Sequence, residues 1–398
     1  MQNLLRKIAG FLICIIGSNL YAEKLAIVWE KEFGIDENLS YVAHDAIYTN
    51  GILSLTGYAF EPRTKTSTGV YWFWQINRMG NMLSHDNFYT VSNRRIDFGS
   101  WRTKGLKVDQ SSMYCAGKVG SEESSLIGFG ITDKKFFQAP IQPDPGKTSE
   151  QLEKEPAETI LKMISLSDNK FLLVGQGGGS KGFAKKTNAV GNISWHKVYK
   201  KGKTSFIVDA IEMGDKLVLV DCHTEAEKNP YEGYSCRLLI CDLEGNILSE
   251  KTVEGGGAFP NKFPELHKID SSHFWVGHDK DFMPNRIKYF ITAFDSNLTR
   301  LWEKSVFDDE SKAPIYAHIL PLTSGEFIAA YSKTTFDIVV TKYAVSGESS
   351  ASLSLKNYLA IDNFLIVGSG DRCFIVGLSE LKNDKGLVRT KIAALSIE

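Results

Sequence analysis

Short apolar runs at strand spacing recur along this chain, and each is bounded by small polar residues. In residues 286–332, apolar side chains run through Tyr289, Ile291 and Ala293 and stop at the polar residues 295–297. Asn and Asp side chains at such a stop bond their own backbone and favour a tight reversal. The stretch predicts four short strands, and a single four-stranded unit cannot bury both faces of its sheet alone.

The same unit recurs about seven times. In each copy one strand ends in an apolar run just before a connection, and most copies carry Gly at the equivalent place. Consecutive anchors from Gly57 to Gly377 lie roughly 46 to 60 residues apart, a period that belongs to propeller blades or solenoid repeats. Helical periodicity is almost absent, so the spacing predicts an all-β fold. The runs cover residues 52–58, 113–118, 171–176, 217–222, 274–278, 327–332 and 373–378.

The two ends of the chain decide between a ring and an open rod. Residues 25–32 match the outer strand of the unit, and residues 387–397 match the third strand. Each end therefore supplies what the other lacks, and joining them removes two unpaired sheet edges. We predict a seven-bladed β-propeller of four-stranded antiparallel blades over residues 23–398, with the N-terminal strand completing the last blade.

The first 22 residues have the layout of a secretory signal peptide. Arg6 and Lys7 precede an apolar run over residues 8–17, and a small-residue site ends at Ala22. The run is about half the length of a membrane span, and the alternative interpretation is an uncleaved anchor. We expect an exported chain, periplasmic or extracellular, without a membrane span.

Charge excludes one class of partner. The chain carries 46 basic and 47 acidic side chains, and removal of the leader takes away Arg6 and Lys7. A nearly neutral protein has no basic field to attract nucleic acid, so we expect no nucleic-acid partner, and we expect a monomer.

Cysteine spacing suggests one covalent link. Cys222 ends one predicted strand and Cys236 begins the next, which makes them the pair to be bridged in an oxidising compartment. Cys115, Cys241 and Cys373 lie within apolar runs and are expected to be buried, inert thiols.

Three segments carry a family resemblance: LLICDLEGNILSEK (238–251), AKKTNAVGNISWHK (184–197) and ITAFDSNLTRLWEK (291–304). They resemble the x-Asp-x-x-Gly-x-x-x-Trp repeats of bacterial exported propellers, including the quinoprotein-like superfamily. That superfamily's dehydrogenases have eight blades, a recurrent Trp-docking motif and, in many members, adjacent cysteines at the cofactor. This sequence offers seven blades, Trp at some blade positions and no adjacent cysteines, so the resemblance implies the fold and does not carry the cofactor.

Longer connections between strands mark the expected binding face. They are predicted at residues 91–101, 140–156, 223–235, 254–263 and 279–286. In this strand order they lie opposite the short hairpin turns, and loops on a rigid scaffold are where binding residues concentrate. The default site is therefore this face together with the mouth of the central channel.

Two groups of residues are ligand-binding candidates. Arg94, Arg95, Asp97 and Trp101 combine groups that bind anions with an aromatic face for stacking; the alternative is a solvated loop with Trp101 tucked into its blade.

The second group is His278, Asp279, Asp281 and Arg286, in which two carboxylates offer oxygens to Ca²⁺ but are too few for a dedicated site. No cofactor or metal is predicted. The sequence supports a metal site at His223, Glu225 and Glu227 even less than a Ca²⁺ site at Asp279 and Asp281. His44 and Asp45 are interpreted as a structural pair on an inner strand.

Function remains divided between two hypotheses. The first is a non-catalytic exported propeller that binds a protein, peptide or glycan through its long-loop face, because no recognised catalytic motif accompanies the blade pattern. The second is a propeller enzyme, a glycoside hydrolase, lyase or quinone-dependent dehydrogenase, with carboxylates from different blades meeting at the channel mouth. A structural or adhesion role is a third possibility, and the sequence identifies no catalytic residue.

Overall fold

The computed structural model describes residues 25–60, 70–88, 96–97, 106–108, 112–119, 123–130, 136–140, 158–178, 180–225, 235–253, 264–283, 286–306, 317–322, 324–334, 336–344, 347–359, 364–380 and 387–397. Every helix or strand assigned within these ranges is a β-strand. The expected leader, residues 1–22, lies outside them. Across the described ranges, no helix has the length and apolar character needed to cross a membrane.

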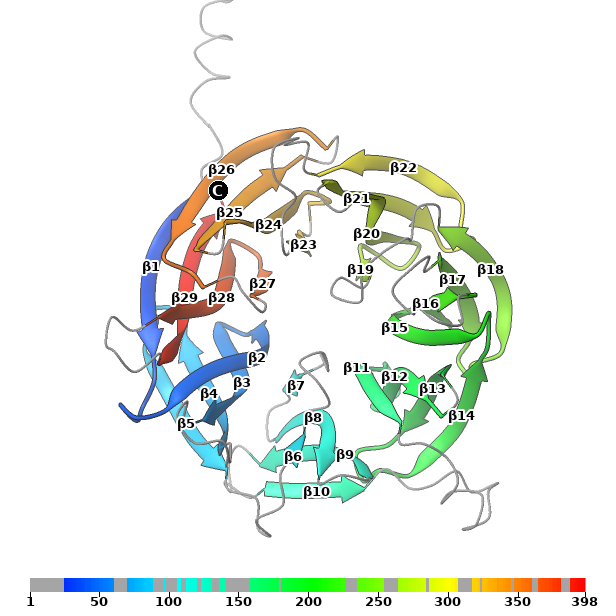
Figure 1. The fold of residues 1–398 in the computed structure, drawn as a ribbon, viewed down its shortest axis with the longest axis horizontal. Helices are drawn as coiled ribbons and strands as arrows, with labels where there is room; N and C mark the ends of the chain where they lie inside the picture. Colours follow the sequence, from blue (N-terminus) through cyan, green and yellow to red (C-terminus); the bar gives the residue numbers. More distant parts are fainter. Residues whose placement is uncertain are drawn as a thin grey trace, which may run out of the picture.

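The strands pair into seven antiparallel sheets arranged as the blades of a ring (Figure 1). Blade 1 consists of β2 (Ser40–Thr49), β3 (Ile52–Phe60), β4 (Val70–Asn77) and β5 (Met82–Phe88). Blade 3 consists of β11 (Thr159–Ser165), β12 (Phe171–Gly177), β13 (Lys181–Thr187) and β14 (Ile193–Tyr199). Blade 4 consists of β15 (Thr204–Met213), β16 (Lys216–Thr224), β17 (Ser235–Asp242) and β18 (Ile247–Val253).

The remaining blades follow the same meander order. Blade 5 consists of β19 (Glu265–Lys268), β20 (His273–Met283), β21 (Arg286–Asp295) and β22 (Arg300–Ser305). Blade 6 consists of β23 (Ala317–Pro321), β24 (Phe327–Thr334), β25 (Asp337–Tyr343) and β26 (Ser349–Lys356). In blade 2, the short strands β6 (Ile96–Asp97) and β7 (Lys107–Val108) both pair with β8 (Ser112–Val119), followed by β9 (Glu123–Gly130) and β10 (Phe136–Pro140).

Blade 7 closes the ring as the sequence predicts. It joins β27 (Leu365–Ser369), β28 (Arg372–Glu380) and β29 (Val388–Ile397) to the N-terminal strand β1 (Leu25–Phe33). The register runs from Leu25 opposite Ile397 to Phe33 opposite Thr390. The last sheet therefore takes its outer strand from the opposite end of the chain, and the expected all-β, seven-bladed fold is confirmed.

Two of the expected long connections differ from the prediction. Residues 279–286 form mostly strand, because β20 continues to Met283 and β21 begins at Arg286, so that two residues connect them. Pro and Asn, which stand at 284 and 285, are both turn-forming residue types, and the polar Asp279 pairs its backbone with Tyr289. Within residues 91–101, Ile96 and Asp97 pair with β8 as a short strand.

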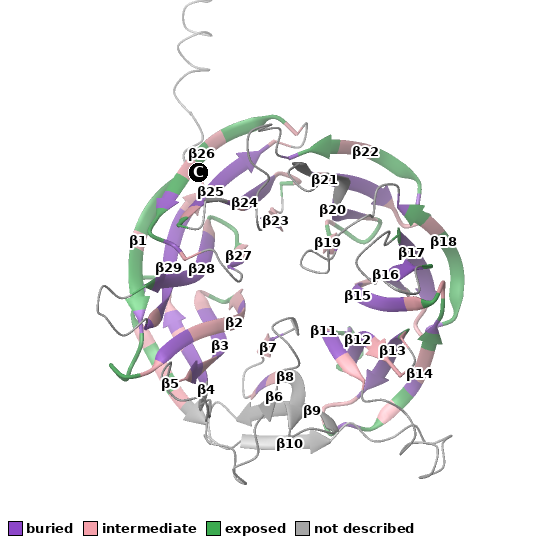
Figure 2. Ribbon diagram, viewed as in Figure 1, coloured by how far each residue is buried: buried purple, intermediate pink, exposed green. Residues whose placement is uncertain are grey.

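The apolar core lies between neighbouring blades. Figure 2 shows buried residues along the middle strands and exposed residues along the outer ones. One buried cluster joins blade 7 to blade 1 through Trp72, Trp74, Leu365 and Phe374, and the two Trp rings stack with centroids 3.9 Å apart. Because each blade buries its two faces against its neighbours, no blade has a complete core of its own.

Candidate functional site

The strand order separates two faces of the ring. One side of the ring, here named the turn face, carries two turns of each blade. They join the first strand to the second and the third strand to the fourth. The opposite side, here named the connection face, carries the hairpin loops between second and third strands and the links between blades. Most residues of the expected long connections lie outside the described ranges, so the geometry described here comes from the turn face and the channel wall.

The turns between third and fourth strands share one local design. In blade 4, Asp242 Oδ1 accepts from the backbone N–H groups of Glu244 and Asn246 at 3.0 and 2.8 Å. Gly245 adopts a φ of +77°, a conformation that Gly reaches without steric cost. Asn77 and Asn188 hold the equivalent turns in blades 1 and 3 through their side-chain oxygens. Hydrogen bonding from the Asn246 side chain and from the turn backbone holds the pKa of Asp242 below its ordinary value.

Outer-strand residues of one blade dock onto this turn in the next blade. The indole N–H of Trp195 in blade 3 donates to the carbonyl oxygen of Leu243 at 2.9 Å, and the Tyr199 hydroxyl donates to that of Gly245 at 2.9 Å. At the ring closure, Trp29 of β1 donates to the Arg78 carbonyl at 2.8 Å. These turn carbonyls are therefore engaged in holding neighbouring blades together.

Two aspartates on inner strands also join blades. Asp209, 3 % exposed, lies at a bulge in β15, where its Oδ1 accepts from its neighbour Ala210 N–H at 2.6 Å. Its Oδ2 accepts from the backbone N–H of Leu266 in blade 5 at 2.9 Å. Lys162 of blade 3 forms an ion pair with the same carboxylate. One side chain thus contacts three consecutive blades.

Asp45 repeats this arrangement in blade 1. It lies at the bulge of β2, accepts from the Ala46 N–H at 2.8 Å, and accepts from the Leu106 N–H at the start of blade 2 at 2.7 Å. The interpretation of Asp45 as structural agrees with these contacts. The shared pattern Asp-Ala-Ile at 45–47 and 209–211 is the sequence signal that could have identified the pair of clamps.

One cluster on the channel wall lies toward the connection face. Glu265 begins β19, and its Oε1 lies 2.9 Å from Nδ1 of His318 near the start of β23. Its Oε2 lies 3.7 Å from Nε2 of His267. Inner strands begin at the connection face, so a carboxylate and two imidazoles lie near the channel mouth. Glu265 and His267 share β19, but sequence analysis missed the cluster because His318 belongs to the next blade.

The first group of predicted ligand residues is largely outside the described ranges. Arg94, Arg95 and Trp101 lie there, and for Asp97 the structure describes the backbone, which pairs with Lys118 in blade 2. These four residues therefore remain predictions about the connection face.

In the second group, Asp279, Asp281 and Arg286 belong to the paired strands β20 and β21. His278 is 2 % exposed, and its Nε2 lies 2.9 Å from Oγ1 of Thr292. Thr292 in turn donates to Glu303 at 3.0 Å. The imidazole is thus packed within blade 5, stacked near Phe290.

A buried ion network crosses blade 4. Arg237 contacts the fully buried Asp221 through Nε at 2.7 Å and Glu250 at 2.5 Å. Ser205 donates to the other oxygen of Asp221 at 2.6 Å. Hydrogen bonding from Lys201 lowers the pKa of Glu250, with Arg237 adding to the effect. Burial lowers the pKa of the neighbouring His223, so its imidazole favours the neutral state.

Within the described part of the chain, no three His, Cys, Asp or Glu residues are arranged to hold a metal ion.

Comparison with known proteins supports the fold and no narrower class. No family model matches the chain, and no curated protein does so at a significant level. A protein of unknown function from Dyadobacter fermentans superposes with a TM-score of 0.51 at 10% identity, over 94% of this chain and 99% of that one. The β-propeller domain of the Trilobed protease from Pyrococcus furiosus gives a TM-score of 0.51 at 10% identity, over 90% and 94%.

A puromycin-hydrolyzing peptidase from Mycobacterium tuberculosis gives a TM-score of 0.53 at 11% identity. The match covers 88% of this chain and 53% of that chain, so this chain spans about half the length of the peptidase. At these identities the likeness shows the fold alone. The chain is a β-propeller, and its neighbours are of mixed kinds.

Proposed function

We propose that this chain is a non-catalytic, exported β-propeller that binds a protein, peptide or glycan through its connection face and acts as a monomer. The observation that carries the proposal is that Asp45 and Asp209, which lie on inner strands, join neighbouring blades. Both carboxylates accept backbone N–H groups of the following blade. A carboxylate held this way is an acceptor in a structural bond, and protonating it or moving it toward a substrate would break the junction between blades.

The turn face supports the same assignment. Its carbonyls at Arg78, Leu243 and Gly245 accept from the preceding blade, and its carboxylates accept from their own turns. Short, internally bonded turns leave little polar capacity for a ligand. The connection face, which carries the longer segments, is the better candidate for recognition.

We also propose a distant relationship to the quinoprotein-like superfamily, without its cofactor. The docking of Trp29 and Trp195 onto turns of the next blade supports it, since Trp ends the repeat pattern on which the resemblance rests. A purified protein that binds a quinone cofactor stoichiometrically would contradict the cofactor-free part of this proposal.

The experiment compares matched variants on the two faces. Alanine at Arg94, Arg95, Asp97 and Trp101 removes the candidate groups of the connection face. Met79→Ala and Val190→Ala remove side chains that are each 65% exposed on the turn face. Glycan and peptide arrays identify a ligand for the unmodified protein, and titration then measures its affinity for each variant.

We expect the first set to weaken binding at least tenfold and the second set to leave it unchanged, at equal thermal midpoints. Equal affinity across both sets would disprove the assignment to these four residues. Failure of the unmodified protein to bind any array member, together with turnover of a substrate, would replace the binding function itself.

The Glu265 cluster favours a second candidate function, an enzyme with its site at the channel mouth. A carboxylate between two imidazoles can move protons. Turnover in panels of glycosidase, lyase and quinone-dependent dehydrogenase substrates tests it, with Glu265→Gln beside the unmodified protein. Activity that Glu265→Gln abolishes would establish this candidate, and inactivity of the unmodified protein across the panels counts against it.

A further inference from the structure

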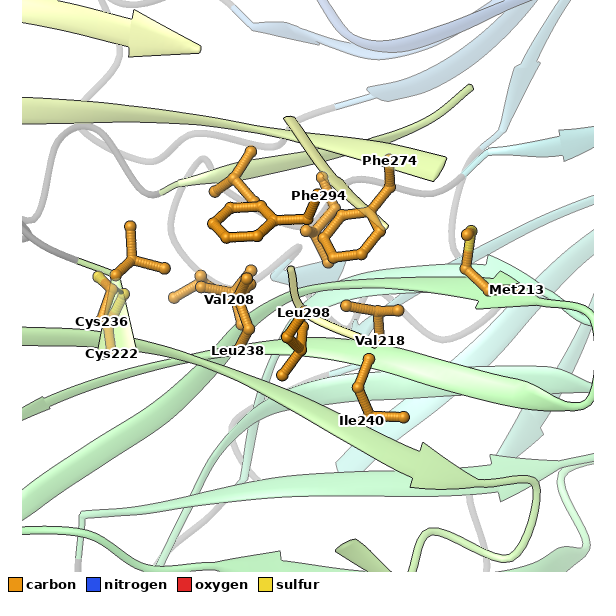
Figure 3. Close-up of a cluster of buried hydrophobic side chains, with 14 of the residues drawn as sticks. Val208, Met213, Val218, Cys222, Cys236, Leu238, Ile240, Phe274, Phe294 and Leu298 are labelled. Carbon is orange, nitrogen blue, oxygen red and sulfur yellow. Dashed lines mark hydrogen bonds between the residues drawn. The ribbon is translucent and has the colours of Figure 1, made fainter. Parts of the chain in front are cut away.

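Two buried cysteines face each other across blade 4. Cys222 of β16 lies directly opposite Cys236 of β17 in the strand register, and their Sγ atoms are 2.9 Å apart. Each residue is 3% exposed. Figure 3 shows the two side chains next to each other in a cluster of buried apolar side chains. In the structure both carry free thiols. They lie near the connection-face ends of their strands, where the segment between β16 and β17 leaves the blade.

We propose that Cys222 and Cys236 are an oxidation site, at which a cross-strand disulfide forms and ties the two strands together at the connection face. Directly opposed residues of an antiparallel pair have Cα atoms about 4.5 to 5.5 Å apart, within the range that a disulfide spans. The two side chains lie on one face of the sheet, so the bond needs no change of register.

The reaction balances as a thiol–disulfide exchange. One cysteine, as its thiolate, attacks an external disulfide of low molecular mass or of a thiol-oxidising protein, and a mixed disulfide forms as one thiolate leaves. The second cysteine then attacks the mixed disulfide and releases the other thiolate. The protein loses two protons and two electrons, and the external disulfide takes them up and is reduced to two thiols.

The surroundings of the pair decide when the exchange takes place. Cys222 and Cys236 pack with Val208, Leu238 and Val253 in the apolar cluster between blades 4 and 5. Burial is the main cause that raises the pKa of the Cys222 thiol well above its ordinary value, which suppresses the thiolate. We therefore expect the bond to form before the blades close over it and to resist reductants once they have closed.

The other described cysteines provide the contrast. Cys241 lies opposite Leu217 and Ile247, and Cys373 lies opposite Leu395 and Gly368. Both are fully buried, and burial raises the pKa of Cys241 to about 11. Neither has a cysteine across the strand pair, so these two serve as internal controls.

The test is refolding of the full mature chain under defined redox conditions. The chain is unfolded with reductant and refolded in glutathione buffers of increasing oxidised fraction, and non-reducing peptide mapping then locates any link. Cys241→Ser and Cys373→Ser should keep the link. Cys222→Ala should leave Cys236 open to alkylation after unfolding, and the double variant Cys222→Ala with Cys236→Ala gives an unlinkable reference.

We expect one link, between Cys222 and Cys236, and a thermal midpoint for the linked form roughly 4 °C above that of the reduced form. Free thiols at both positions after oxidising refolding, or a link to a different cysteine, would overturn the proposal.

The identity of the compartment that supplies the oxidant depends on the export proposed above. The refolding result does not depend on export. Peptide mapping of protein recovered from an exporting host tests the compartment separately from the chemistry of the cysteine pair. A link formed in vitro but absent from exported material would contradict the proposed compartment and leave the chemistry of the pair intact.

Discussion

The indole N–H of Trp29 donates to the backbone carbonyl of Arg78 at 2.8 Å, and this bond joins blade 7, which contains β1 and β29, to blade 1. Lys31 reinforces it by donating to the Gly80 carbonyl at 2.8 Å. The ring therefore closes through two kinds of contact, the backbone pairing of β1 with β29 and side-chain docking of β1 onto the next turn.

Trp29→Ala should lower the free energy of unfolding by about 2 kcal/mol, because it removes both the ring packing on the turn and the N–H bond. Trp29→Phe keeps the ring, loses the donor and should cost about 1 kcal/mol. Urea unfolding measures both. A Trp29→Phe variant as stable as the unmodified protein would contradict a contribution from the Arg78 bond.

Gly80→Ala and Gly51→Ala form a matched pair. Both glycines have a positive φ, +76° and +78°, but a Cβ on Gly80 would lie 2.9 Å from the Trp29 ring, whereas one on Gly51 meets nothing within 4 Å. Each variant carries a backbone penalty of about 1 kcal/mol. Gly80→Ala should cost at least about 1 kcal/mol more, since the Trp29 ring must move, and thermal unfolding of both variants measures the difference.

Asp209→Ala should be strongly destabilising, by about 3 kcal/mol. It leaves the Leu266 N–H without its acceptor and Lys162 without its buried ion pair. Asp215→Ala changes an exposed carboxylate in the turn of the same blade and should be nearly neutral. Chemical denaturation of both variants supplies the comparison, and similar midpoints would show that Asp209 does not join the blades energetically.

Asp242→Asn should make the stability of the protein depend less steeply on pH in the acid range. The pKa of Asp242 is lowered in the folded state, so its contribution is present above the unfolded pKa, near 3.9, and is lost as pH falls through the folded pKa. Asn at 77 and 188 already holds the same turn, so the variant should fold. Thermal midpoints recorded from pH 6 down to strong acid should fall less steeply for Asp242→Asn than for the unmodified protein.

Deletion of residues 25–32 should destabilise the ring more than any point change in β1. It removes the outer strand of blade 7 and the docking residue Trp29 and exposes the edge of β29. Thermal unfolding and light scattering report the two effects. A deleted chain that unfolds at an unchanged midpoint would contradict closure by β1.

The architecture could be predicted because it depends on local signals. Each strand has its own apolar run, and each turn has its own Gly or Asn, such as Gly245 and Asn188, so the period was visible without any tertiary information. The match of residues 25–32 to an outer strand rested on the same kind of signal, and β1 confirms it.

The site could be predicted less well, because its contacts join residues from different blades. Glu265 and His318 are 53 positions apart, and nothing near either residue in the sequence indicates the other. His278 was expected near a rim loop, since polar residues follow it, but β20 continues to Met283 and the His278 side chain is 2% exposed. A local pattern cannot distinguish a polar loop from a polar stretch of paired strand.

Pairing of Leu25 with Ile397 has a consequence for how the protein is made. During synthesis β1 emerges before any of its partners, and its hydrogen-bonding groups must wait until β29 has followed. Contacts of such long sequence separation form slowly, so the last blade should be assembled only after translation is complete. Until that moment β1 is an unprotected strand, and a holding chaperone would have its clearest target there.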